Sequence, residues 1–441
     1  MEYKEDRMKL NYLTATELIK KLRQKKIKAE EVCRDCLEMI ALKDKEVKAW
    51  EYINEELVLR YAREIDRKKD LKTLHGVPVA VKDIFNTKDM PTTMGSPIWK
   101  GFMPGNDARV VHNIRMNDGI ILGKTVTAEF AVHFLPEHKT RNPHSLKHSP
   151  GTSSSGSAAA VASHMVPLAL GTQTAGSIIR PASYCGIFGF KPTFGTVPRT
   201  AMLKTTDTLD TVGCFARSID DIRILFDSIR VSGSNYPFVN NCLKEYDVSK
   251  RSNIRIGVIS DTIDVFRGFE QYVFDRFDAY INKLGKKNNV RLTKIKPSSD
   301  FNKIHRIHSL IYDKTLSYYF KEEFKQKTFI SDIMYEIIAR GNKIPVADYI
   351  KALTDQARIR QAIGGELKSY DAILTPSTAG EPPLAGEIEN PDTCLIWTFL
   401  GWPSLNIPMF RGPHNMPMGL QAVAKRYDDY KLLYIAKNFL I

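Results

Sequence analysis

The stretch from Pro150 to Gly195 constrains the fold of this 441-residue chain more than any other, and reads PGTSSSGSAAAVASHMVPLALGTQTAGSIIRPASYCGIFGFKPTFG. A Gly/Ser loop leads into strong helix formers from Ala158 to Val161. The apolar run from Val166 to Leu170 then has the length of a buried strand, and a second small-residue loop follows from Gly171 to Ser177. Each loop presents serines on flexible backbone, where unpaired N–H groups can gather around a negative charge.

Three common interpretations of such loops do not fit. A phosphate-binding loop is excluded because Ser157 stands where its lysine is required. A hydrolase nucleophile elbow is excluded because neither Ser153 nor Ser177 is followed two residues later by glycine. A flexible linker is disfavoured because the serines alternate with apolar runs that are typical of buried segments.

The stretch resembles the signature of the amidase signature family of serine hydrolases. The shared motifs are the Gly-x-Ser-Ser-x-Gly-Ser loop, the Thr-x-Gly-Ser loop, and the Cys-Gly-x-x-Gly-x-Lys-Pro-Thr segment from Cys185 to Thr193. In that family the nucleophile is the serine of the second loop, here Ser177. The first serine of the Ser-Ser pair, here Ser153, relays its proton, and the resemblance implies a cis peptide bond there.

A serine hydroxyl is a weak nucleophile and needs a base within reach. Upstream, the apolar strand Gly76 to Val81 ends in Lys82, and burial would lower the pKa of that lysine. The family places its catalytic lysine in the same Gly-Val-Pro-x-x-x-Lys-Asp context, so the resemblance implies that Lys82 is the base. The alternative is a strand-end lysine that reaches water. Ser154 is expected to support the amine as a nearby hydrogen-bond partner.

The resemblance also implies an oxyanion hole made by the backbone N–H groups of Thr174, Ala175, Gly176 and Ser177. Three positions depart from the family pattern. Gln173 replaces an aspartate and removes a supporting charge, Ala175 replaces a glycine and narrows the backbone angles of the loop, and Arg180 comes one residue later than usual. The three catalytic positions themselves are intact.

Alternating helical and strand patterns predict an α/β fold, with a large, mixed, mostly parallel sheet covered on both faces by helices. We expect one amidase domain over 1–441, with a core at about 72–222, a variable pocket-shaping segment at about 230–370, and a sheet-completing segment at about 371–441. The predicted helices are 15–23, 29–42, 55–69 and 107–117. The predicted strands are 48–54, 120–122 and 254–260.

Composition is ordinary for a soluble globular protein, with 43% apolar and 26% charged residues. No apolar run approaches the roughly 20 residues of a membrane span, and the first residues are too charged for a secretory signal, so we expect a cytoplasmic protein. Lys and Arg number 64 against 50 for Asp and Glu, giving a net charge of +14. Since these charges are scattered, a solvated basic surface is favoured over nucleic-acid binding, with a tRNA role left open.

Neither a metal nor a cofactor is expected. Cys33 and Cys36 form a Cys-x-x-Cys without a second pair, which favours structural thiols. Four histidines lie around Glu137, but their spacing matches no zinc pattern and serine–lysine chemistry requires no metal. These histidines are His133, His138, His144 and His148.

The substrate is expected to be a small-molecule amide with a small or apolar acyl group. This follows from apolar residues near the family's pocket positions, which are Met94, Ala131, Val132, Trp397 and Phe399. The leading hypothesis is an amidohydrolase that cleaves linear carboxamides, with a homodimer possible. The alternatives are the amidase component of a tRNA-dependent amidotransferase, which would release ammonia from glutamine, and a catalytically silent binding member of the family.

Overall fold

The computed structural model describes residues 9–70, 72–132, 139–232, 243, 253–261 and 263–441. Its described strands form one 11-stranded sheet in the order β1-β3-β2-β4-β6-β5-β10-β11-β9-β7-β8. The strands are β1 (Trp50–Tyr52), β2 (Pro78–Lys82), β3 (Ile120–Thr125), β4 (Leu168–Gln173), β5 (Phe188–Lys191), β6 (Thr211–Ala216), β7 (Ile254–Val258), β8 (Val290–Lys294), β9 (Ala372–Pro376), β10 (Ser404–Arg411) and β11 (Pro417–Val423).

The sheet is mixed, as predicted, but the expectation of a mostly parallel sheet is wrong. Strand β2 pairs in parallel with β3 and β4, and β7 pairs in parallel with β8 and β9. All the other described pairs are antiparallel. The reason is that β5, β6, β10 and β11 fill the middle of the sheet, and the short connection between β10 and β11 allows only antiparallel pairing.

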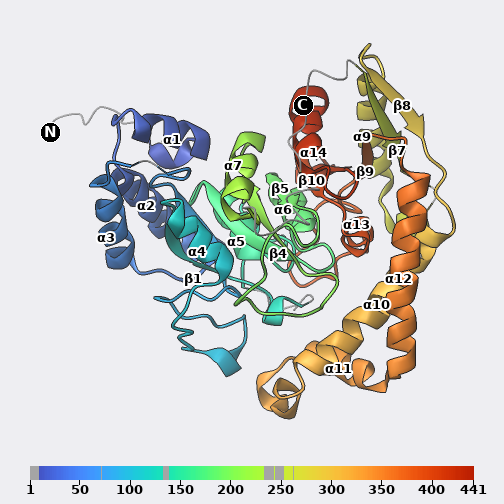
Figure 1. The fold of residues 1–441 in the computed structure, drawn as a ribbon, viewed down its shortest axis with the longest axis horizontal. Coiled ribbons are helices and arrows are strands. Elements are labelled where there is room, and N and C mark those ends of the chain that lie inside the picture. The colour runs from blue at the N-terminus through green and yellow to red at the C-terminus, as the bar shows by residue number, and fades with distance from the viewer. Residues whose placement is uncertain (1–8, 71, 133–138, 233–242, 244–252, 262) are drawn as a thin grey trace.

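Helices cover both faces of this sheet, which confirms the α/β class (Figure 1). Helices α5 and α6 pack on each other and on the central strands, whereas α11 and α12 both pack on α10, which also packs on α13. The helices are α1 (Ala15–Arg23), α2 (Ala29–Val47), α3 (Glu55–Asp66), α4 (Arg109–Met116), α5 (Ser155–Ala162), α6 (Ile179–Cys185), α7 (Ile219–Ile229), α9 (Gln271–Leu284), α10 (Asp300–Tyr319), α11 (Asp332–Lys343), α12 (Val346–Glu366), α13 (Cys394–Leu400) and α14 (Asp429–Ile435).

Local sequence patterns predicted most of the helices and strands in the N-terminal part of the chain correctly. Thr14 and Glu17 form the capping box that starts α1. Helix α2 continues five residues beyond the predicted end and stops at Lys48, which adopts a left-handed conformation. Strand β4 runs on to Gln173, so the second small-residue loop is shorter than the sequence suggested.

Sheet register brings the two signature segments together. In the parallel pair β2–β4, Val79 lies opposite Leu168 and Val81 opposite Leu170. Parallel strands end at the same edge of a sheet, so Lys82 and Thr172 come to lie side by side. The loops before α5 and α6 reach the same edge.

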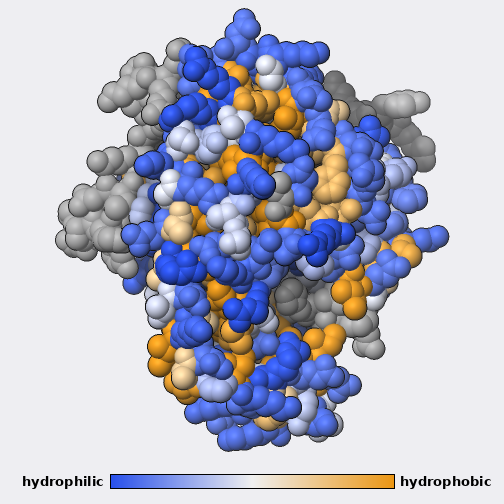
Figure 2. Space-filling view, turned by 90° about the vertical axis from the view of Figure 1, so that its right-hand side faces the viewer, coloured by the Kyte–Doolittle hydropathy of each residue, from blue (hydrophilic) through white to orange (hydrophobic). Residues whose placement is uncertain are grey.

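The face beyond α12 is mostly hydrophilic, with hydrophobic areas between the polar residues (Figure 2). In the described part of the chain, no helix combines the length and apolar character needed to cross a bilayer.

Candidate active site

Lys82, the last residue of β2, is completely buried. Its Nζ donates hydrogen bonds to Ser153 Oγ at 2.8 Å and to Thr172 Oγ1 at 3.0 Å. Burial penalises the ammonium form and lowers the pKa of Lys82 to about 7, although the nearby carboxylate of Asp210 acts in the opposite direction. The amine is therefore partly neutral at neutral pH and touches a hydroxyl that can pass on a proton.

Ser153 lies in the loop before α5 and is also buried. The Thr152–Ser153 peptide bond is cis. The carbonyl oxygen of Ser153 accepts a hydrogen bond from Ala128 N at 3.2 Å. The Thr152 N–H and hydroxyl both donate to Glu389, at 3.1 and 2.8 Å. The loop that carries Ser153 is thus held on two sides.

Ser154 contacts Lys82 only indirectly, through Thr172. Its hydroxyl donates to the carbonyl oxygen of Thr172 at 3.2 Å and accepts from the Thr172 N–H at 3.3 Å. Because the Thr172 side chain accepts from Lys82, Ser154 fixes the residue that orients the amine. Ser154 makes no hydrogen bond to Lys82 itself, and sequence reasoning missed Thr172, whose only signal was its place at the end of the neighbouring strand.

Ser177 lies between β4 and α6 and is partly exposed, unlike Lys82 and Ser153. Within the described residues its hydroxyl has no hydrogen-bond partner, so contact between Ser177 and Ser153 is not made here. Catalytic hydrogen bonds are often looser before substrate binds. The structure therefore brings Lys82 and Ser153 into contact and leaves the Ser177 hydroxyl outside that pair.

The loop before Ser177 is anchored through its carbonyl groups. His308 Nε2, on α10, donates to the oxygen of Thr174 at 2.9 Å, and the Thr398 hydroxyl, on α13, donates to the oxygen of Ala175 at 2.7 Å. In a planar trans peptide the N–H points away from the carbonyl oxygen, so the N–H groups of Ala175 and Gly176 face the opposite side. Those N–H groups have no backbone acceptor among the described residues.

Gln173, which the resemblance places where the family has an aspartate, makes three hydrogen bonds through its uncharged amide. Its Oε1 accepts the N–H groups of Ile178 and Ile179 at 2.8 and 2.9 Å, and its Nε2 donates to Thr398 Oγ1 at 2.9 Å. The side chain therefore satisfies two free donors at the start of α6. Ala175 is not among the residues with positive φ, so a side chain at this position needs no left-handed backbone.

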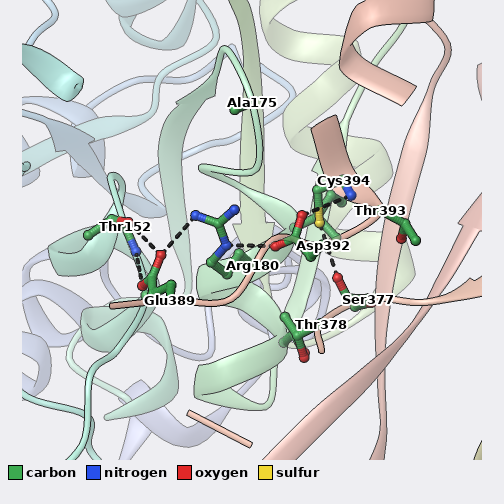
Figure 3. A network of polar contacts seen from close by, with 12 residues as sticks. Thr152, Ala175, Arg180, Ser377, Thr378, Glu389, Asp392, Thr393 and Cys394 are labelled. Carbon is green, nitrogen blue, oxygen red and sulfur yellow. Dashed lines mark hydrogen bonds and ion pairs between the residues drawn. The ribbon is translucent and has the colours of Figure 1, made fainter. Parts of the chain in front are cut away.

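Arg180 is enclosed by two carboxylates that sequence reasoning missed. Its Nε donates to Asp392 at 2.6 Å and its Nη1 to Glu389 at 2.8 Å (Figure 3). The first effect of burial is to lower the pKa of Arg180, but the attraction of these carboxylates dominates and holds the pKa well above its usual value. Both partners follow Arg180 by more than 200 residues, so no local pattern connects them.

The predicted pocket residues separate into two groups. Met94 lies beside the end of β2, because its N–H donates to Asp83 O and its carbonyl accepts from Phe130 N. Ala131 and Val132 follow Phe130 in the segment after β3 and are largely buried. Trp397 and Phe399 are fully buried in a hydrophobic cluster, and neither lines the cavity beside Arg180.

Two cavities lie near the catalytic loops. One, of about 310 Å³, is lined by Thr93, Gly95 and Ala128 among others, on the side of Ser153. The other, of about 350 Å³, is lined by Ala175, Arg180 and apolar side chains including Leu395. Neither cavity has Lys82, Ser153 or Ser177 among its lining residues.

Of the remaining candidate ligands, the structure describes Cys33, Cys36, His144 and His148. Cys33 and Cys36 are buried free thiols, and burial raises the pKa of Cys36 to about 12. His144 Nε2 donates to the Cys185 carbonyl oxygen. His133, Glu137 and His138 lie outside the described residues, and the part that the structure describes holds no cluster of metal-ligating side chains.

Comparison with protein families agrees with this geometry. The model of the family described as Amidase matches residues 31–433. The chain belongs to the Amidase family. The family acts on carbon–nitrogen bonds, which agrees with a lysine–serine pair at the edge of the sheet.

Curated relatives extend the match over nearly the whole chain. One Glutamyl-tRNA(Gln) amidotransferase A-subunit of Clostridium acetobutylicum is 30% identical, over 98% of this chain and 97% of that protein. The corresponding A-subunit of Agathobacter rectalis is also 30% identical, over 98% of this chain and 94% of that protein.

Solved structures share the fold. The Glutamyl-tRNA(Gln) amidotransferase A-subunit from Thermotoga maritima has a TM-score of 0.81 and 28% identity, over 97% of this chain and 95% of that one. Peptide amidase from Stenotrophomonas maltophilia has a TM-score of 0.83 and 24% identity, over 97% of this chain and 96% of that one. At that lower identity the likeness shows the fold alone.

Proposed function

We propose that this chain hydrolyses a carboxamide through Lys82, Ser153 and Ser177, by way of an acyl-enzyme. The observation that carries the proposal is the 2.8 Å hydrogen bond between the buried amine of Lys82 and the hydroxyl of Ser153. A lysine whose pKa is lowered to about 7 can accept a proton at neutral pH, which an ordinary lysine cannot.

The reaction begins when substrate brings Ser177 and Ser153 into contact. Neutral Lys82 takes the proton of Ser153 as Ser153 takes that of Ser177, and the Ser177 oxygen attacks the amide carbon. The proton then returns through Ser153 to the leaving nitrogen, and the C–N bond breaks. Water, activated by the same relay, attacks the acyl-enzyme and releases the acid.

The negative charge on the carbonyl oxygen needs donors that are already in place. The N–H groups of Ala175 and Gly176 are the best placed, because His308 and Thr398 hold the carbonyl groups of the same peptides. Thr174 and Ser177 complete the proposed hole. Fixed donors of this kind usually make the largest electrostatic contribution to acyl transfer.

A panel of linear amides tests the proposal. Intact-protein mass spectrometry should detect a covalent adduct on the native chain and none on Ser177→Ala, and acid and ammonia should accumulate only with the former. An adduct on another residue, or hydrolysis that survives Ser177→Ala, would assign the chemistry elsewhere. Failure of a fluorophosphonate probe to label Ser177 would favour the catalytically silent alternative.

A second candidate function rests on the curated relatives. Those aligned over nearly the whole chain are A-subunits of Glutamyl-tRNA(Gln) amidotransferase. Under this alternative the acyl-enzyme would form from glutamine, and the ammonia would pass to charged tRNA. Glutamine hydrolysis that depends on tRNA and on a partner protein would support it. Partner-free hydrolysis of simple amides supports the first proposal.

A further inference from the structure

The cavity beside Arg180 has a mixed lining. Ile333, Ile388 and Leu395 supply apolar walls, and Ala175 places the cavity against the loop that leads to Ser177. His305 also lines it, and burial lowers the pKa of His305, so this side chain adds no positive charge at neutral pH. Arg180 is therefore the one positive group among the lining residues of this cavity.

One end of the guanidinium is still available. Nε and Nη1 are used by Asp392 and Glu389, but Nη2 donates to none of the described residues. In Figure 3 this nitrogen points toward the loop that carries Ala175. A Cβ built on Gly176 would lie 2.8 Å from Nη2, so the free donor sits directly against the residue before Ser177.

The two carboxylates also line this cavity, but each is already bound by groups of the protein. The side chains of Glu389 and Asp392 are 4% and 1% exposed, and that of Arg180 is 7% exposed. Glu389 already accepts from Thr152 and Arg180, and Asp392 from Arg180 and the Cys394 N–H. Each of the four carboxylate oxygens already accepts a hydrogen bond, so a ligand amine would compete with Thr152, Arg180 or Cys394 for it.

The charge of the groups around Arg180 decides which ligand group can accept a hydrogen bond from Nη2. One guanidinium faces two carboxylates within 2.8 Å, which leaves a net negative charge in the cluster. The two carboxylates already outweigh the positive charge of Arg180. A ligand carboxylate would therefore be repelled by Glu389 and Asp392, and such like-charge contacts disfavour binding. A neutral carbonyl oxygen accepts the same hydrogen bond without that repulsion.

We infer that this cavity is the acyl-side subsite of the proposed amidase, and that it takes a neutral acyl group whose distal carbonyl oxygen accepts from Arg180 Nη2. The inference rests on the proposed function and names its substrate class as amides with a second neutral carbonyl, such as diamides. Amides of dicarboxylic acids that keep one free carboxylate are excluded, as are those with a distal ammonium.

Three amides of matched length test the inference. Butanediamide carries a neutral distal group, succinamic acid an anionic one and γ-aminobutyramide a cationic one. We expect kcat/KM for butanediamide to exceed the other two on the order of tenfold or more, because the charged groups lack a compatible partner. Equal or higher kcat/KM for either charged amide would overturn the inference.

A charge-removal variant adds an independent measurement. Asp392→Asn removes one of the two carboxylate charges, so the ratio of succinamic acid to butanediamide should rise. Glu387→Gln is the matched control, since it removes an exposed charge from the same segment and should leave the ratio unchanged. A ratio that does not move in folded Asp392→Asn contradicts the charge argument.

Binding separates this inference from the proposed function. Calorimetry of the three amides with Ser177→Ala should give the same order of affinity without chemistry. If no amide is hydrolysed but the order is kept, the proposed function fails and the subsite stands. If amides are hydrolysed but the order is reversed, or the neutral amide does not bind, the subsite assignment fails.

Discussion

Two strands of the sheet end in a fully buried lysine, β2 at Lys82 and β5 at Lys191. Burial lowers the pKa of both to about 7. Lys82 donates to two hydroxyl groups, whereas Lys191 donates to the backbone carbonyl oxygens of Pro192 and Trp402. A hydroxyl can pass on a proton and a carbonyl oxygen has none to give. A lowered pKa alone therefore does not identify a catalytic base.

The largest expected effect lies at the end of the Lys82 relay. Ser177→Ala removes the nucleophile and should lower kcat by about 10⁴-fold or more. Because Ser177 is partly exposed and makes no hydrogen bond to a described residue, the unfolding temperature should stay unchanged. The rate of ammonia release gives kcat, and a thermal unfolding experiment gives the unfolding temperature. Retained activity would remove Ser177 from the mechanism.

Exchanging each lysine in turn tests the comparison directly. Lys82→Met should lower kcat by roughly 10³-fold, within the range for loss of a general base. Lys191→Met should leave kcat within a few-fold of the native value, because its partners cannot relay a proton. Steady-state kinetics on both variants, with circular dichroism to confirm folding, gives the answer. A larger kcat loss in Lys191→Met would reverse the assignment.

The pH dependence of kcat should report Lys82. Below a pKa of about 7 the amine is protonated and cannot act as a base, so kcat should fall about tenfold per pH unit toward acid and level off above about pH 8. The Lys191→Met variant should keep the same midpoint, although Lys191 has a similar pKa. A midpoint that moves in that variant would mean that the profile reports a different group.

A smaller effect is expected at Thr172, which accepts the second hydrogen bond of Lys82. Thr172→Val should lower kcat about fivefold, since one hydrogen bond contributes on the order of 1 kcal/mol. Thr172→Ser keeps the hydroxyl and should restore most of the rate. If both variants behave alike, packing rather than the hydrogen bond positions the amine.

Candidate catalytic residues could be predicted from the sequence where a short motif of neighbouring residues contains them. The small-residue loops and the Lys-Asp pair after an apolar strand carry the family resemblance, which implies the roles of Lys82, Ser153 and Ser177, and these roles stay predictions until they are tested. Pocket walls were harder to predict, because apolar residues near a site and apolar residues in the core look alike in sequence. Trp397 and Phe399 are fully buried in a hydrophobic cluster with α10 and α12.

What the sequence determined by itself was the fold class, the family and the residue types available for acyl transfer, because each depends on local order and spacing. Only the tertiary structure decided the charge around Arg180 and the partner of Gln173. Glu389 and Asp392 follow Arg180 by 209 and 212 residues, and Thr398 follows Gln173 by 225. Contacts over such separations arise when strands from both ends of the chain meet in one sheet, and no local pattern encodes them.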